Sequence, residues 1–126
     1  MILDVAHNPA AADKLTHYLQ TEKISGRTLA VFGCMLDKDA SAIIESLSAV
    51  VDDWLIAEID YPRAMAGADI DQELHRFGVK NRQIFASVIH AVRAAVAQSG
   101  PEDRVVVLGS FHVVGPALEE LGEVNK

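Results

Sequence analysis

The sequence predicts an α/β fold of the Rossmann-like, three-layer type, in which a mostly parallel sheet carries helices on both faces. Apolar runs of strand length alternate along the chain with longer segments in which apolar residues recur at helical spacing. The turns that connect these segments are short. Strands and helices that alternate in this way build parallel sheets through right-handed crossovers. The same pattern does not determine the order of the strands in the sheet.

The first half of the chain is predicted to form a strand, a helix, a strand and a helix. Residues 2–6 are an apolar run that stops at turn residues, as a short buried strand does. Asn8 and Pro9 suit the N-cap and first turn of a helix that runs to about Thr21. Residues 29–33 form a continuous apolar run, typical of a strand covered on both faces. The next helix has one apolar face, made by Ala40, Ile43, Ile44, Leu47 and Val51.

The second half continues this alternation. Residues 54–59 are the third predicted strand, which Pro62 prevents from continuing. We expect Asp69 to cap a short helix that Gly78 ends. The remaining elements are a short strand at residues 83–85, a helix at 87–98, a strand at 104–109 and a last helix whose apolar positions extend to Leu121.

Length and composition indicate one domain that covers residues 1–126. Half of the residues are hydrophobic, which is enough for one core, and the chain is too short for two domains. A formal net charge of −7, with the basic residues spread out, argues against binding to nucleic acid or to an anionic membrane. The single cysteine, Cys34, excludes an intrachain disulfide and is expected in the core.

The chain carries no recognisable targeting or membrane-spanning segment. No apolar run reaches the ~18 residues that a membrane span needs, and no basic region precedes an apolar segment as in a signal peptide. We therefore expect a soluble, cytoplasmic protein, and we expect it to be a monomer. Because the first predicted strand begins at residue 2, we also expect an upstream part of the protein outside this sequence, with Met1 at the cut.

Polar residues follow several of the predicted strands and should meet at one edge of the sheet, because parallel strands have their carboxyl ends on the same side. These residues are His7, Asp37 with Lys38, Asp60 with Arg63, and Ser110. Arginine can grip a carboxylate with two hydrogen bonds, and lysine supplies a point charge. The set suits a small ligand with carboxylate or phosphate groups.

Each of these residues also has a purely structural interpretation. His7 could close a tight turn, Ser110 could cap the last helix, and Lys38 could pair with a neighbouring aspartate. Asp4 lies inside a strand, where an unpaired carboxylate is costly to bury, so it either lies near an exposed edge or binds something. His112 could reach the same edge or remain on the surface. Polar loops border any sheet of this kind.

Known phosphate-binding motifs are absent from the sequence. There is no G-x-x-x-x-G-K-[ST] loop, no G-x-G-x-x-G motif, no Cys/His metal cluster and no nucleophile elbow. If the chain acts on ATP, it must complete a site that begins elsewhere.

The run Asp4-Val5-Ala6-His7-Asn8-Pro9 resembles the motif that opens the C-terminal domain of folylpolyglutamate synthases, in particular the bacterial bifunctional dihydrofolate synthase/folylpolyglutamate synthases, which belong to the Mur ligase superfamily. The resemblance extends over nearly the whole chain, through residues 32–39, 50–54, 62–63 and 109–112. The segment Asp60-Tyr61-Pro62-Arg63 is similar to the D-N-P-R motif with which some Mur ligases hold their amino acid, although Tyr61 replaces the asparagine.

The resemblance implies a C-terminal ligase domain that works with an upstream ATP-binding domain, where the phosphate loop and the Mg²⁺ ligands lie. ATP would phosphorylate a carboxylate of dihydropteroate or folate, and the amine of L-glutamate would attack the acyl phosphate. The family pattern implies contacts of Asp4 and His7 with ATP and a catalytic role for His7 beside the glutamate. Ser110, Lys38 and Arg63 would bind the glutamate. The 126 residues alone would be inactive.

Two other functions remain open from the sequence. One is a Mur-type ligase domain that adds an amino acid to a peptidoglycan precursor. The other is a non-catalytic, flavodoxin-like binding module, which tight binding of a ligand by these residues alone would favour.

Overall fold

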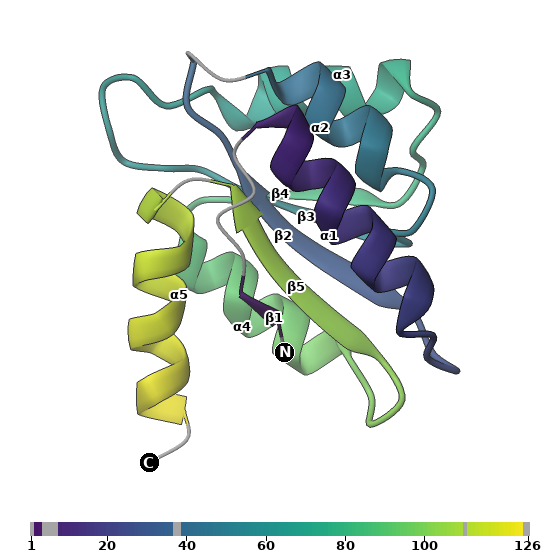
Figure 1. The fold of residues 1–126 in the computed structure, drawn as a ribbon. Coiled ribbons are helices and arrows are strands. Elements are labelled where there is room, and N and C mark those ends of the chain that lie inside the picture. The colour runs from purple at the N-terminus through teal and green to yellow at the C-terminus, as the bar shows by residue number, and fades with distance from the viewer. Residues whose placement is uncertain (1, 4–7, 37–38, 110, 125–126) are drawn as a thin grey trace.

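Five parallel strands form a single sheet in the order β1-β5-β2-β3-β4 (Figure 1). The structure is a computed structural model, and it describes residues 2–3, 8–36, 39–109 and 111–124. The strands are β1 (Ile2–Leu3), β2 (Thr28–Gly33), β3 (Asp53–Ala57), β4 (Arg82–Phe85) and β5 (Arg104–Gly109). The helices are α1 (Pro9–Thr21), α2 (Ala40–Leu47), α3 (Gly67–Arg76), α4 (Val88–Gln98) and α5 (Phe111–Val124).

The helices cover both faces of the sheet, which confirms the predicted three-layer architecture. Helices α1, α2 and α3 pack on one face, and α4 and α5 pack on the other (Figure 1). Successive side chains of a strand point to opposite faces. On β2, Ala30 and Phe32 accordingly join the first core, while Leu29 and Val31 join the second. Because both faces are covered, β2 is buried at every position, as its continuous apolar run predicts.

Two helices begin at polar residues that cap their first turns. The Asn8 side chain accepts a hydrogen bond from the backbone N–H of Ala11 at 2.9 Å, and Pro9 is the first residue of α1, as predicted. Ser87 caps α4 in the same way through the N–H of His90. Among the described helices, none is long and apolar enough to cross a membrane.

Three predicted boundaries are wrong, and at two of them a local turn follows an element that ends early. Strand β3 ends at Ala57 rather than at residue 59, where the Ile59 carbonyl accepts a hydrogen bond from Tyr61. Helix α2 ends at Leu47, whose carbonyl accepts from both Val50 and Val51, so Val51 is buried but not helical.

Helix α3 begins earlier than the sequence predicts, and Asp69 lies within its first turn instead of at its cap. The N-cap residue, Ala66, has no side-chain oxygen, so the first N–H groups of the helix need another acceptor. Glu58, nine residues earlier in the chain, accepts from the N–H of Gly67 at 2.6 Å. A carboxylate suits the positive end of a helix, so Glu58 caps α3 from outside the helix.

The amino-terminal ends of the strands are joined by arginine side chains. Arg27, just before β2, donates to Asp53 at 2.7 Å and to the carbonyl of Gln98 at 3.1 Å. Arg104, at the start of β5, donates to Thr28 and to the last carbonyls of α1. We call this side of the sheet the amino edge. The opposite side, where the strands end, is the carboxyl edge.

Candidate functional site

The carboxyl edge is where the sequence places its candidate ligand-binding residues. Strands β2 and β5 end side by side at this edge, with Gly33 paired to Gly109, and β3 ends next to β2. Four of the five predicted site residues, Asp4, His7, Lys38 and Ser110, lie outside the described residues. Their placement therefore stays a prediction. Arg63 lies within the described residues.

The segments that follow β2 and β3 are hydrogen-bonded to each other. The N–H of Leu36 donates to the carbonyl of Arg63, and the N–H of Met65 donates to the carbonyl of Cys34, both at 2.8 Å. Between these bonds, Met35 pairs with Ala64 in an antiparallel bridge. We call residues 34–36 and 63–65 the paired loops. They hold the backbone of Arg63 in place at the carboxyl edge.

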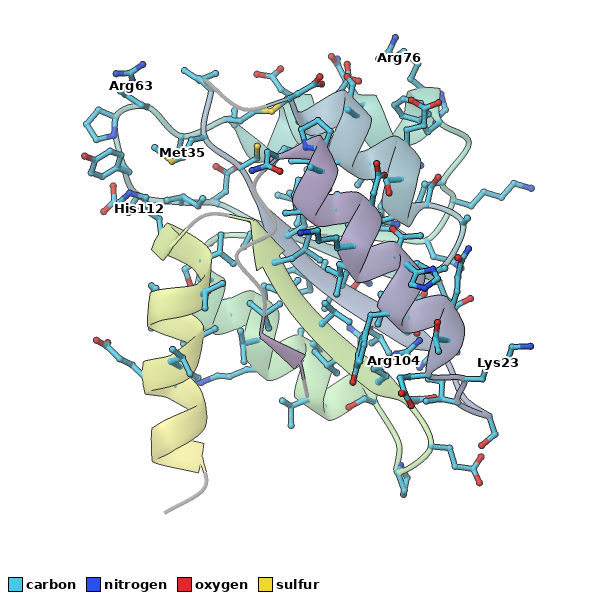
Figure 2. All side chains as sticks on the ribbon, viewed as in Figure 1. Lys23, Met35, Arg63, Arg76, Arg104 and His112 are labelled. Carbon is cyan, nitrogen blue, oxygen red and sulfur yellow. The ribbon has the colours of Figure 1, made fainter. Side chains whose placement is uncertain are left out.

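The guanidinium of Arg63 has no partner among the described residues, whereas the other described arginines are engaged. Arg63 is exposed, and its side chain has no hydrogen bond or ion pair with any described residue. Ion pairs hold the others: Arg27 binds Asp53, Arg76 binds Glu73, Arg82 binds Asp71 and Arg93 binds Glu120. Arg104 donates instead to Thr28 and to carbonyl oxygens. Figure 2 shows Arg63 at the far end of the molecule from Arg104.

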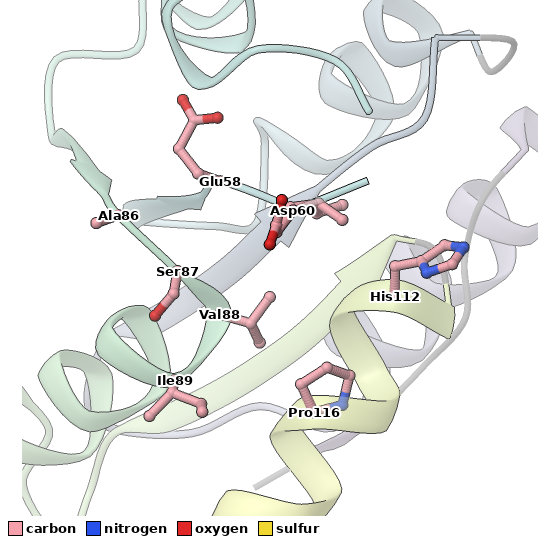
Figure 3. A pocket seen from close by; sticks show the side chains of 9 residues that line it. Glu58, Asp60, Ala86, Ser87, Val88, Ile89, His112 and Pro116 are labelled. Carbon is pink, nitrogen blue, oxygen red and sulfur yellow. The ribbon is translucent and has the colours of Figure 1, made fainter. Parts of the chain in front are cut away.

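A cavity of about 330 Å³ lies below this loop, between the start of α4 and the start of α5. Its walls combine apolar side chains with a polar rim: Glu58, Ile59, Asp60, Ala86, Ser87, Val88, Ile89, His112 and Pro116. Figure 3 shows Asp60, Val88 and Pro116 around it, each from a different element. Of the two acids among the lining residues, Glu58 caps α3, whereas Asp60 is an exposed carboxylate that disfavours an anion in this cavity.

Tyr61 and His112 stack across this region. Their ring centroids are 4.3 Å apart and their planes are inclined by 29°. Tyr61 precedes Arg63 by two residues, and His112 lies in the first turn of α5. The stack therefore connects the β3–α3 loop to α5. The sequence left open whether His112 reaches the carboxyl edge or remains on the surface away from it, and the structure places it at the carboxyl edge.

Two glycines allow α5 to start close to the sheet. A Cβ on Gly33 would meet the side chains of Val113 and Ile59 at 2.8 and 2.9 Å. Gly109 has a φ of +121°, and a Cβ there would strike the carbonyl oxygen of Gly33. Only glycine adopts such a backbone readily. Gly109 thus allows β5 to end close to β2, and Gly33 leaves room for Val113 in the first turn of α5.

The sequence did not identify Glu58, Ser87 or the Tyr61–His112 stack as parts of this edge. Glu58 was placed inside the third strand, and only the true strand end reveals it as the first polar residue after β3. Ser87 follows the weakest strand signal in the chain, β4. The position of a serine before an amphipathic helix was the available signal.

No group of three or more histidine, cysteine, aspartate or glutamate side chains that could hold a metal ion occurs among the described residues. The carboxyl edge, as far as it is described, offers one free cation, one aromatic stack and an acid-rimmed cavity.

This chain belongs to the Mur ligase family, with the glutamate ligase domain matched over residues 1–111. It is 44% identical over 119 residues to the dihydrofolate synthase/folylpolyglutamate synthase of Escherichia coli K12, a match that covers 94% of this chain and 27% of that protein. It is also 36% identical over 129 residues to a UDP-N-acetylmuramoyl-L-alanyl-D-glutamate–2,6-diaminopimelate ligase from Corynebacterium efficiens, covering 93% of this chain and 24% of that ligase.

Solved structures of folate ligases share the fold. The E. coli FolC structure in complex with DHPP and ADP superimposes with a TM-score of 0.85 at 39% identity, over 97% of this chain and 28% of that one. A bifunctional folylpolyglutamate synthase/dihydrofolate synthase with Mn, AMPPNP and L-glutamate bound gives a TM-score of 0.86 at 36% identity, over 95% of this chain and 29% of the other. The chain thus spans about a quarter of the length of the relatives that it matches.

Proposed function

We propose that this chain is the C-terminal domain of an ATP-dependent amide ligase that adds L-glutamate to dihydropteroate and to the glutamate tail of folates. The observation that carries the proposal is the 44% identity to a dihydrofolate synthase/folylpolyglutamate synthase over 94% of the chain. The structural match to a relative with Mn, AMPPNP and L-glutamate bound supports the same substrates.

The reaction that we propose has two steps. The γ-phosphate of ATP is transferred to a carboxylate of the pteroate or folate acceptor, which gives an acyl phosphate and ADP. The amine of L-glutamate then attacks the acyl carbon, an amide bond forms, and inorganic phosphate leaves with the bonding electrons of the C–O bond. The amine loses its protons to a base or to water in this second step.

Arg63 is the described residue best suited to the incoming glutamate. Its backbone is fixed by the paired loops, and its guanidinium is exposed with no partner among the described residues. A free guanidinium can bind a carboxylate through two parallel hydrogen bonds. The carboxylate of the adjacent Asp60 disfavours a carboxylate on the cavity side. We propose that Arg63 binds a carboxylate of glutamate from the side that faces away from the cavity.

The other predicted site residues keep their roles as part of the proposal. Asp4 contacts the nucleotide on its ribose side, and His7 acts where the phosphate meets the glutamate. Ser110 and Lys38 help to hold the glutamate. The phosphate loop and the ligands of Mg²⁺, which neutralises phosphate charge when it is bound, are proposed to lie in an upstream domain. We further propose that the enzyme is a cytoplasmic monomer.

The proposal is tested on the full-length gene product by measuring ADP release with Mg²⁺, ATP, L-glutamate and dihydropteroate, with the product identified by mass. We expect glutamate-dependent ADP release and dihydrofolate formation. The His7→Ala variant should lose most of this activity. The matched control, His17→Ala, changes an exposed histidine on α1 and should retain it.

A Mur-type ligase is the second candidate, favoured by the 36% identity to the diaminopimelate ligase of C. efficiens. The same assay separates the two when UDP-muramoyl peptides replace dihydropteroate as the acceptor. ADP release with those acceptors alone would overturn the folate assignment. The absence of ADP release with either acceptor would overturn the ligase proposal and leave the binding module.

A further inference from the structure

We propose that the stacked pair Tyr61–His112 positions Arg63 for the incoming amino acid, so that Tyr61 is a positioning residue that sets the affinity for glutamate. This inference rests on the proposed function. It concerns a contact between two side chains that come from different elements, a loop after β3 and the first turn of α5.

The backbone around Arg63 is already restrained within its own loop. The N–H of Tyr61 donates to the carbonyl of Ile59 at 2.9 Å, and the N–H of Ala64 donates to the carbonyl of Tyr61 at 3.0 Å. Pro62, between Tyr61 and Arg63, has a fixed φ. Together these contacts fold residues 59–64 into a hydrogen-bonded turn.

That turn is held at both ends, since Ile59 packs against the core and Arg63 belongs to the paired loops. Between these ends, the side chain of Tyr61 joins the turn to α5 by stacking on His112. Without the ring of Tyr61, the exposed part of the turn would be less restrained, and the guanidinium of Arg63 would sample more positions.

The partner of Tyr61 belongs to a well-anchored element. Helix α5 starts against the sheet because Gly33 leaves room for Val113, which is fully buried. Further along, Glu120 is 5% exposed and pairs with Arg93 of α4. The position of His112 is therefore fixed by α5, and its stacking contact with Tyr61 restrains the turn that carries Arg63.

A tyrosine that only covers the surface would behave differently from one that positions Arg63. Tyr61 is 48% exposed, so its removal costs little core packing. A covering role predicts no change in substrate affinity. A positioning role predicts that removing Tyr61 selectively raises the KM for glutamate, because glutamate must then order the Arg63 side chain on binding, at a cost in conformational entropy.

The first experiment measures steady-state kinetics with the full-length enzyme. We expect Tyr61→Ala to raise the KM for glutamate about 3- to 10-fold, in keeping with the usual strength of an aromatic pair, and to leave kcat and the KM for ATP within about twofold. Tyr61→Phe keeps the ring and should restore the wild-type KM. The control Tyr18→Ala removes a tyrosine that is 50% exposed on α1 and should change nothing.

The second experiment asks whether Tyr61 acts through Arg63. In an Arg63→Ala background, Tyr61→Ala should add no further rise in the KM for glutamate. If the two effects multiply instead, Tyr61 acts independently of Arg63 and the positioning role is wrong. An unchanged KM in Tyr61→Ala, or an equal loss in Tyr61→Phe, would also overturn it. A wild-type enzyme without glutamate-dependent ADP release would instead overturn the proposed function itself.

Discussion

The two edges of the sheet are held together by different means. At the amino edge, Arg27, Arg82 and Arg104 lie at or just before the starts of strands, and each donates to several oxygens. At the carboxyl edge, backbone groups connect the loops, and one acidic side chain, Glu58, caps α3. There the paired loops exchange N–H···O bonds, two glycines bring β5 and β2 close, and the charged side chains of Asp60 and Arg63 have no described partner.

This difference separates stability from binding. A charged side chain that is satisfied within the protein fixes the fold but has no capacity left for a ligand. A backbone hydrogen bond fixes a loop and leaves its side chains available. The amino edge therefore contributes stability, and the carboxyl edge presents groups for recognition on a loop that is nevertheless held in place.

The largest loss of stability is expected when a methyl group is added to Gly109 at the carboxyl edge. Gly109→Ala places a Cβ against the Gly33 carbonyl at a φ of +121°, and we expect it to lower the free energy of unfolding by about 3–5 kcal/mol. At the amino edge, Gly78→Ala has a φ of +79° but meets no atom within 4 Å, so it should cost only about 1 kcal/mol. Urea unfolding of both variants makes the comparison. Equal costs would show that close backbone packing does not hold the carboxyl edge.

The second prediction concerns the arginines. Arg63→Ala should lower kcat/KM for glutamate about 100-fold in the full-length enzyme, because a charge-assisted pair of hydrogen bonds is lost. The unfolding midpoint should remain unchanged, since Arg63 has no described partner. Arg27→Ala should do the reverse, lowering stability while leaving kcat/KM within about twofold. A large loss of stability in Arg63→Ala would contradict the division between the edges.

Only part of this difference between the two edges could be predicted from the sequence. Apolar runs predicted β1, β2, β3 and β5, a weaker signal predicted β4, and Asn8 with Pro9 predicted the start of α1, because these signals are local. The order β1-β5-β2-β3-β4 was not predictable, since the apolar pattern of a strand does not determine which strands lie beside it. Contacts between distant residues were also missed. Glu58 caps α3 and Tyr61 stacks on His112 only because the chain folds back on itself.

The third prediction tests the amino edge directly. Arg104 donates to Thr28 and to the carbonyls of Leu19 and Glu22. These last two bonds provide donors for carbonyl groups at the C-terminal end of α1. Arg104→Ala should lower the free energy of unfolding by about 2 kcal/mol. Trp54, which is the only tryptophan and is 1% exposed, reports the transition by fluorescence. Arg104→Lys should recover only part of the loss, because lysine cannot reproduce the branched geometry. Full recovery would mean that charge alone matters.

The smallest effect is expected from Asp103, and it should depend on pH. Hydrogen bonds from the N–H groups of Gly100 and Arg27, both at 2.8 Å, lower the pKa of Asp103 below its ordinary value of 3.8. Because its pKa is lower in the folded state than in the unfolded state, Asp103 stabilises the fold above the unfolded pKa. That contribution is lost as the pH falls through the folded pKa.

Asp103→Asn should therefore lower the urea midpoint at pH 7, and the difference from wild type should shrink once the pH falls below about 4. The matched variant at the carboxyl edge is Asp60→Asn, which changes an exposed carboxylate without a described partner and should leave the midpoint unchanged at pH 7. If Asp60→Asn destabilised the chain as much as Asp103→Asn, the carboxylates of both edges would serve the fold, and the carboxyl edge would not be reserved for a ligand.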